Sequence, residues 1–124
     1  MPVAVATSAS RYDAVRVLRE LDFYHHFRAV VTSDDVFRGK PDPAVYRLAL
    51  SRLNGTSPKP EPPIQARECL VIEDSLAGIQ SARAAGMQVL AVATTYPLAQ
   101  LGAAQAVWTD LRTVDWERLE VLFG

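Results

Sequence analysis

The sequence predicts an α/β fold with a mostly parallel sheet and helices on both faces. Short apolar segments alternate with amphipathic segments along the chain. This alternation is typical of βαβ crossovers, in which consecutive strands run parallel. The length of 124 residues, 49% of them hydrophobic, fits one globular domain. Ligands of such sheets bind beyond the carboxyl ends of the strands, so the residues that follow each strand are the first candidates for a site.

The N-terminal third begins with a strand, a helix and a second strand. Residues 3–6 are apolar and precede a Thr-Ser-Ala-Ser cluster, as in a buried strand. Apolar residues recur at helical spacing over residues 10–21, with charged residues opposite them. Residues 28–33 are expected to form the second strand. A loop at 34–40 follows it, with a glycine as its flexible point.

The middle of the chain contains one well-delimited helix. Asp42 suits the N-cap and Pro43 the first helical position, and Asn54 and Gly55 end the helix. The Pro-rich segment at 56–65 is expected to be an extended surface loop.

The third expected strand carries an apolar run that is typical of burial on both faces of a parallel sheet. It spans residues 69–74 and leads into a helix at 75–86 that is closed by Gly86. A fourth strand is expected at 88–93. Two more elements are expected further on: a short edge strand at 105–109 and a final helix at 115–123.

Composition excludes several classes of function. The net charge of −1 gives no support for binding nucleic acid or an anionic membrane, which would require a basic excess. The apolar start of the chain is too short for a signal or membrane segment. Cys69 is the single cysteine, so no intrachain disulfide can form, and a reducing, cytoplasmic location is expected.

Two adjacent carboxylates, Glu73 and Asp74, follow the third strand. Neighbouring negative charges repel each other unless a cation neutralises them, and carboxylate oxygens are ligands that Mg²⁺ takes together with water and substrate phosphate. The alternative is structural: Asp74 or Ser75 caps the next helix and Glu73 faces water. The spacing alone does not separate the two interpretations.

Hydroxyl and amine groups follow the other strands. Thr7 and Ser8 lie at a strand-to-helix turn, where hydroxyl and backbone N–H groups can hold a phosphate oxygen. Lys40, in the sequence Gly-Lys-Pro-Asp-Pro, can offer a fixed positive charge to a phosphate or a carboxylate. Taken singly, these residues are more commonly a helix cap and an exposed loop lysine. Asp34 and Asp35 also follow a strand and are expected to cap or solvate the loop.

The set as a whole resembles the haloacid dehalogenase-like (HAD) hydrolase superfamily, in particular its β-phosphoglucomutase-like phosphatase branch. The sequences "GKPDP" and "VIEDSLAGIQSARAAGM" carry the resemblance, together with a strand that ends in Thr-Ser. The resemblance implies a Rossmann-like core and phosphoryl transfer through an aspartyl-phosphate. Thr7 and Lys40 would then be catalytic, Thr7, Ser8 and Lys40 would bind phosphate, and Glu73 and Asp74 would hold Mg²⁺. The implied partner is a small phosphorylated metabolite.

The chain departs from that family at its first motif. No Asp-x-Asp-x-(Thr/Val) sequence is present to supply the nucleophile, and the cap domain that selects the substrate is absent as well. Residues 1–124 are therefore expected to be a partial core with motifs two to four, inactive alone. The family's central first strand would be missing, which leaves a gap of ~9–10 Å between two interior strands. We expect the isolated chain either to close this gap by rearranging, to pair with another chain through the open edges, or to be poorly stable.

The leading hypothesis is thus the core of a Mg²⁺-dependent phosphomonoester hydrolase that acts on sugar phosphates, and the lack of a nucleophile is expected to prevent turnover by this chain alone. Two alternatives stay open: a non-catalytic phosphate-binding or interaction module, and a fragment of a phosphomutase. A receiver-like signalling domain has a similar length and similar strand-end residues, but its acidic pair follows the first strand rather than the third.

Overall fold

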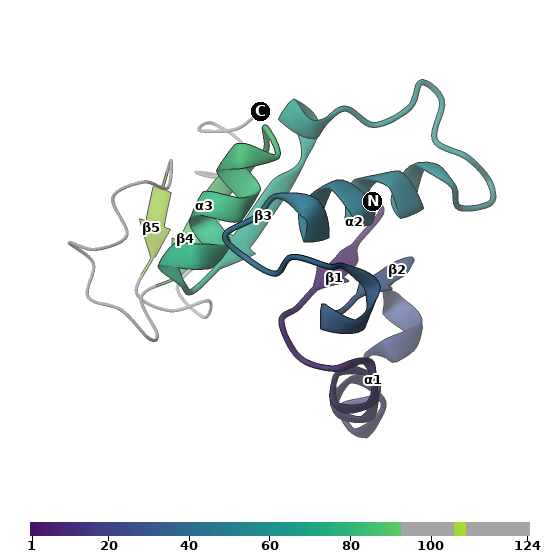
Figure 1. The fold of residues 1–124 in the computed structure, drawn as a ribbon. Coiled ribbons are helices and arrows are strands. Elements are labelled where there is room, and N and C mark those ends of the chain that lie inside the picture. The colour runs from purple at the N-terminus through teal and green to yellow at the C-terminus, as the bar shows by residue number, and fades with distance from the viewer. Residues whose placement is uncertain (93–105, 109–124) are drawn as a thin grey trace.

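The computed structural model describes residues 1–92 and 106–108 of the chain. The expected helix at 115–123 lies outside the described residues. Figure 1 shows how the described strands and helices are arranged. They are β1 (Ala4–Ala6), α1 (Arg11–Glu20), β2 (Ala29–Val31), α2 (Ala44–Asn54), β3 (Leu70–Glu73), α3 (Leu76–Ala84), β4 (Gln88–Val92) and β5 (Ala106–Trp108).

Strands and helices therefore alternate as expected, and three 3₁₀ turns join them. These turns are η1 (Tyr24–His26), η2 (Ser33–Asp35) and η3 (Ala66–Glu68). The expectation of a plain loop after β2 is wrong at its beginning, because η2 occupies it. The Asp35 side chain accepts the Thr32 backbone N–H at 2.8 Å, which closes this turn as a capping box.

Hydroxyl side chains start two of the helices. The Ser10 side chain accepts the Asp13 N–H at 3.2 Å at the start of α1, and the Ser75 side chain accepts the Gly78 N–H at 3.0 Å at the start of α3. Helix α2 begins one residue later than expected, with Pro43 as its N-cap. Asp42 still contributes, because its Oδ1 accepts the Ala44 N–H at 2.9 Å.

The strands form two separate hydrogen-bonded sheets, β1–β2 and β3–β4–β5, in which every neighbouring pair is parallel. Helix α2 packs on β1 and β2, whereas α3 packs on β3 and β4. In Figure 1, α1 and α2 lie on opposite sides of β1 and β2. None of the described helices is long and apolar enough to cross a membrane.

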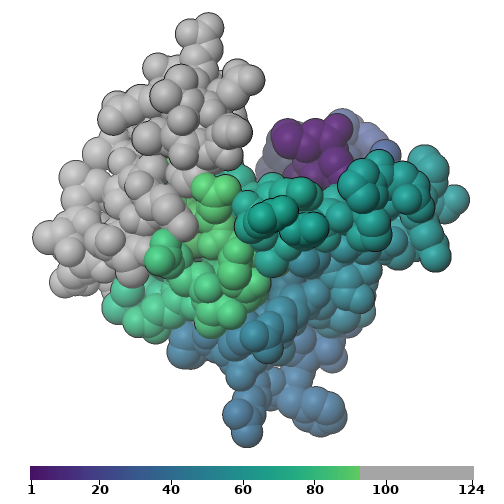
Figure 2. All heavy atoms as spheres, turned by 90° about the horizontal axis from the view of Figure 1, so that it is seen from above, coloured from purple at the N-terminus to yellow at the C-terminus, as the bar shows by residue number. Residues whose placement is uncertain are grey.

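Strands β1 and β3 each present an edge that no described strand pairs with. At the two ends of β1, the Val3 oxygen accepts the Arg28 N–H and the Thr7 N–H donates to the Val31 oxygen. The backbone N–H and C=O groups of Ala4 and Ala6 therefore point away from β2. In Figure 2 the N-terminal residues (purple) and the α3–β4 residues (green) form separate regions of the surface. The expected absence of a strand between β1 and β3 stays a prediction.

The hydrophobic core lies between the sheets and the helices α2 and α3. The expected burial of β3 on both faces is wrong, since Leu70 and Ile72 are 39% and 42% exposed. Val71 and Glu73 alternate with them and are buried, because α2 and α3 cover only that face of the strand. The core cluster consists of Val31, Val45, Tyr46, Ala49, Val71, Ile79, Ala82, Met87, Val89 and Ala91.

Candidate functional site

The structure brings Lys40 to the carboxyl ends of both β1 and β3. Its ammonium Nζ donates to the Ala6 carbonyl oxygen at 3.3 Å and forms an ion pair with Oε1 of Glu73. The two side chains are only 11% and 7% exposed. Thus a cation and an anion that lie far apart in the sequence meet with little solvent between them, where their attraction is screened less than at the surface.

The Glu73 carboxylate is held by several more groups. The Tyr46 hydroxyl donates to Oε1 at 2.5 Å, while the Ser75 hydroxyl and the Asp74 N–H donate to Oε2 at 3.3 and 3.2 Å. The carboxylate also occupies the space beside Gly78, where a Cβ atom would collide with it. Glu73 therefore has a fixed position and does not face water.

Tyr46 is a residue of the candidate site that the sequence analysis did not identify. Burial, and then the negative charge of Glu73, raises the pKa of Tyr46 above its ordinary value, so the phenol stays protonated and acts as a donor. The signal in the sequence was weak: a tyrosine on the buried face of a helix needs a hydrogen-bond partner for its hydroxyl. The identity of that partner follows only from the tertiary structure, which brings Tyr46 of α2 to Glu73 at the end of β3.

Thr7 and Ser8 lie directly after β1, next to the carbonyl group that Lys40 contacts. The Thr7 N–H donates to the Val31 oxygen at 3.0 Å, which fixes the backbone at the end of the strand. The Thr7 Oγ1 accepts the Ala9 N–H at 3.1 Å, an arrangement that leaves its hydroxyl proton available to a ligand. Ser8 is exposed beside it.

Asp74 is exposed at the end of β3, beside the buried Glu73. The donor set suits Mg²⁺ only in part, because both oxygens of Glu73 already accept hydrogen bonds, while Asp74 is an exposed residue. Within residues 1–92 and 106–108, no three His, Cys, Asp or Glu side chains are grouped as metal ligands. Asp74 is thus the better placed of the two carboxylates for direct contact with a cation.

Asp35 does more than cap its turn, because it joins two arginines at the edge of β2. Its Oδ2 pairs with Arg11 at 2.8 Å and its Oδ1 with Arg52 at 3.3 Å. Burial alone would raise the pKa of Asp35, but hydrogen bonds from Thr32 and both guanidinium groups outweigh that effect and hold the pKa well below its ordinary value. Asp35 is therefore an anion whose described partners are Thr32, Arg11 and Arg52.

Comparison with known proteins places this geometry in a family. Residues 1–92 match the family model described as haloacid dehalogenase-like hydrolase. The validoxylamine A 7′-phosphate phosphatase of Streptomyces hygroscopicus subsp. limoneus is 34% identical over 119 residues, which cover 96% of this chain and 52% of that protein.

One further relative is similar in sequence, and one solved structure is similar in fold. The phosphorylated carbohydrates phosphatase of Thermotoga maritima is 37% identical over 86 residues, which cover 69% of this chain and 36% of that protein. The crystal structure of β-phosphoglucomutase from Clostridium difficile superposes with a TM-score of 0.83 at 22% identity, and the match covers 99% of this chain and 49% of that one. The chain thus spans about half, or less, of the length of these relatives.

Proposed function

This chain belongs to the haloacid dehalogenase-like hydrolase family, and from that premise we propose that it forms the phosphate-binding and metal-binding part of a phosphatase that hydrolyses small phosphorylated metabolites, sugar phosphates in particular. The names of its relatives support the substrate class, since one acts on validoxylamine A 7′-phosphate and another on phosphorylated carbohydrates. The observation that carries the proposal is the position of Lys40, which links the end of β1 to the end of β3.

Each residue of the site has a role that its surroundings support. The Thr7 hydroxyl donates a hydrogen bond to a phosphoryl oxygen, and Ser8 adds hydrogen bonds from its backbone N–H and its hydroxyl. Lys40 balances the negative charge that gathers during transfer, in a place with little solvent. Glu73 holds the Lys40 ammonium in position, and the Tyr46 hydroxyl holds Glu73 through a hydrogen bond.

Mg²⁺ is the proposed cofactor, held on the side of the site formed by Glu73 and Asp74. Asp74 is exposed, which suits direct contact with the cation. Glu73 is engaged with Lys40 and borders the site as a buried carboxylate. When bound, Mg²⁺ supplies charge neutralisation for the phosphoryl group. The carboxylate that attacks phosphorus is not among these residues, since the sequence has no Asp-x-Asp motif.

The test of this proposal is an assay of the 124-residue chain with p-nitrophenyl phosphate and Mg²⁺. We expect no turnover, but we expect inorganic phosphate to bind and the binding to be lost in Thr7→Val. Turnover that Asp74→Ala abolishes would overturn the argument about the nucleophile. An absence of phosphate binding in a folded chain would overturn the assignment of Thr7, Ser8 and Lys40.

A second candidate is a phosphate-binding module without catalysis. The sequence favours it through the presence of Thr7 and Lys40 and the lack of a nucleophile motif. An experiment in which the nucleophile is supplied on a second segment distinguishes the two. If a separately supplied segment with an Asp-x-Asp-x-Thr strand restores turnover, the chain is part of an enzyme; binding that never leads to turnover favours the module.

We also propose that the edges of β1 and β3 make the chain self-associate. Neither edge is paired within the described residues, and each unsatisfied buried backbone group costs roughly 1–3 kcal/mol. Leu70 and Ile72 expose apolar side chains next to one of these edges. Sedimentation velocity over a range of concentrations should show association. A monomer that unfolds cooperatively at high temperature would contradict this proposal.

A further inference from the structure

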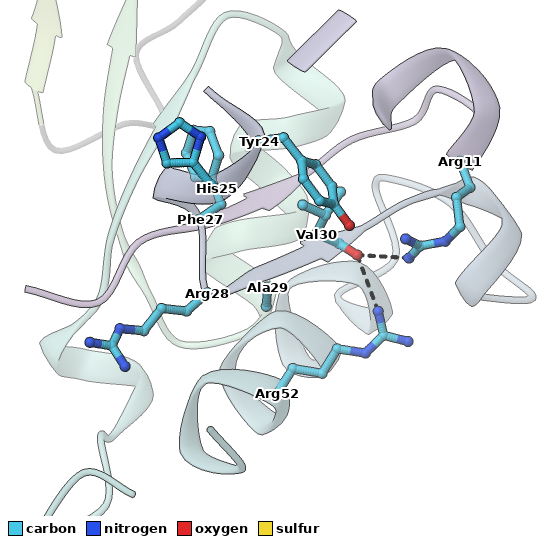
Figure 3. Close-up of a pocket in the computed structure, with 8 residues that line it drawn as sticks. All are labelled: Arg11, Tyr24, His25, Phe27, Arg28, Ala29, Val30 and Arg52. Carbon is cyan, nitrogen blue, oxygen red and sulfur yellow. Dashed lines mark hydrogen bonds between the residues drawn. The ribbon is translucent and has the colours of Figure 1, made fainter. Parts of the chain in front are cut away.

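An open cavity on the outer side of β2 has a concentration of positive charge that the proposed phosphatase chemistry does not use. Its volume is about 480 Å³, and its walls come from α1, η1, β2 and α2. Figure 3 shows the side chains of Arg11 and Arg52 converging on the Val30 carbonyl group from two helices, with Arg28 extending on another side. The cavity lies beyond β2, whereas Lys40 lies at the opposite edge of β1.

The cavity is electropositive because its lining contains three arginines and no carboxylate. Two carboxylates border the arginines: Asp35 pairs with both Arg11 and Arg52, and Asp34 Oδ2 accepts the Arg11 backbone N–H at 2.8 Å. Three cations beside these two carboxylates still leave positive charge in excess at the cavity, in a chain whose net charge is −1. Other arginines differ: Arg16, on the neighbouring surface of α1, pairs with two carboxylates of its own helix.

Arg11 and Arg52 are held in place and still have donors to offer. Arg11 uses Nη2 for both of its bonds, to the Val30 oxygen and Asp35 at 2.8 Å each, so its Nη1 and Nε donors remain. Arg52 uses one bond from Nη1 and one from Nη2, at 3.2 and 3.3 Å. A guanidinium group has five N–H donors, and groups already fixed by the protein lose little freedom when an anion binds.

Arg28 is a cation without a partner among the described residues. Its backbone N–H donates to the Val3 oxygen at 2.8 Å, which fixes the residue at the start of β2, while its guanidinium group makes no ion pair within the described part of the chain. Tyr24 and Phe27 add aromatic side chains to the cavity lining, and Figure 3 shows Tyr24 beside Val30. A ligand with negative charge at two positions and a compact body suits this arrangement.

We propose that this cavity is a second binding site, for a small oxyanion that carries at least two negative charges, as phosphate esters and polycarboxylates do. Guanidinium groups bind both classes through paired N–H donors. The site is separate from the phosphate site at the end of β1, so occupation of one does not require the other. Two probes, inorganic pyrophosphate and citrate, distinguish phosphate from carboxylate as the source of the charge.

The test is titration calorimetry of the 124-residue chain with each probe at low ionic strength. We expect Arg28→Gln to weaken binding of at least one probe about tenfold, the order expected for the loss of a charged hydrogen bond. The affinity of Arg28→Lys for the same probe should lie between that of Arg28→Gln and that of the parent chain. The matched control is Arg47→Gln, which removes the same charge from an exposed position of α2 outside the cavity lining and should leave affinity within about twofold.

Thr7→Val separates this site from the proposed function, because it alters only the phosphate site at the end of β1. Binding that survives Thr7→Val and is weakened by Arg28→Gln supports the cavity, whatever becomes of the phosphatase assignment. If neither probe binds, or if Arg28→Gln and Arg47→Gln weaken binding equally, the cavity is not an anion site. Circular dichroism of each variant verifies that the chain stays folded.

Discussion

The ammonium group of Lys40 pairs with the carboxylate of Glu73 across the space between β1 and β3. No described strand pairing connects the two sheets there, so this ion pair is a polar link between the two halves of the fold. It also places a positive charge at the point where a phosphate would meet the ends of the strands. The same contact therefore bears on stability and on the proposed chemistry.

Replacing Lys40 should leave Glu73 as a buried negative charge without a cation. We expect Lys40→Met to lower the free energy of unfolding by about 3–5 kcal/mol, the usual cost of breaking a buried pair from one side. Urea denaturation followed by circular dichroism measures it. The double variant Lys40→Met/Glu73→Gln removes the orphaned charge and should recover most of the loss. A single variant as stable as the parent chain would show that the pair contributes nothing.

Tyr46→Phe removes only the hydroxyl that donates to Glu73 at 2.5 Å. We expect a loss of about 1.5–3 kcal/mol in the free energy of unfolding, because the bond is made to a charged acceptor in a buried place. Tyr12→Phe is the control, since Tyr12 is 77% exposed on α1 and should show no measurable change. Equal effects of the two substitutions would rule out a special role for the Tyr46 hydroxyl.

Gly78→Ala tests whether the Glu73 carboxylate needs the space beside α3. Alanine ordinarily favours a helix over glycine by about 1 kcal/mol. Here the added methyl group would collide with Glu73, so we expect a net destabilisation of about 1–3 kcal/mol instead. Gly39→Ala meets no atom within 4 Å and serves as the control in denaturation experiments. Stabilisation by Gly78→Ala would mean that Glu73 occupies another position in solution.

Asp35 should make the stability of the chain depend on pH in the acid range. Its pKa is lower in the folded chain than in the unfolded one, so its contribution is complete above the unfolded pKa of about 3.9 and is lost as pH falls below that value, because the unfolded state takes up the proton first. Thermal midpoints measured between neutral and strongly acid pH should show this loss. Asp35→Asn should be less stable at neutral pH and should respond less to acid; an identical acid response in both chains would contradict the assignment.

Some of the site was predictable because it depends on chain order alone. Thr7 and Glu73 lie at strand ends, as the alternation of strands and helices predicted, whereas the position of Lys40 near them was implied only by the resemblance that "GKPDP" carries. The partner of Lys40 was not predictable, since a carboxylate next to Asp74 has equal reason to face a metal ion, a helix N-terminus or water. The paired arginines of Asp35 come from α1 and α2, and no local pattern connects them.

The sequence by itself determined the order and type of the described elements, the parallel connections, and the family, because periodicity, capping residues and short motifs are local properties. The exposure of Leu70 and Ile72 and the inward position of Glu73 were decided only by the tertiary structure. Helices α2 and α3 cover one face of β3, and Gly78 leaves room there for a carboxylate that Lys40 and Tyr46 then hold. Side-chain partners of this kind depend on which elements pack together. The spacing of residues within one element does not indicate which other element will pack against it.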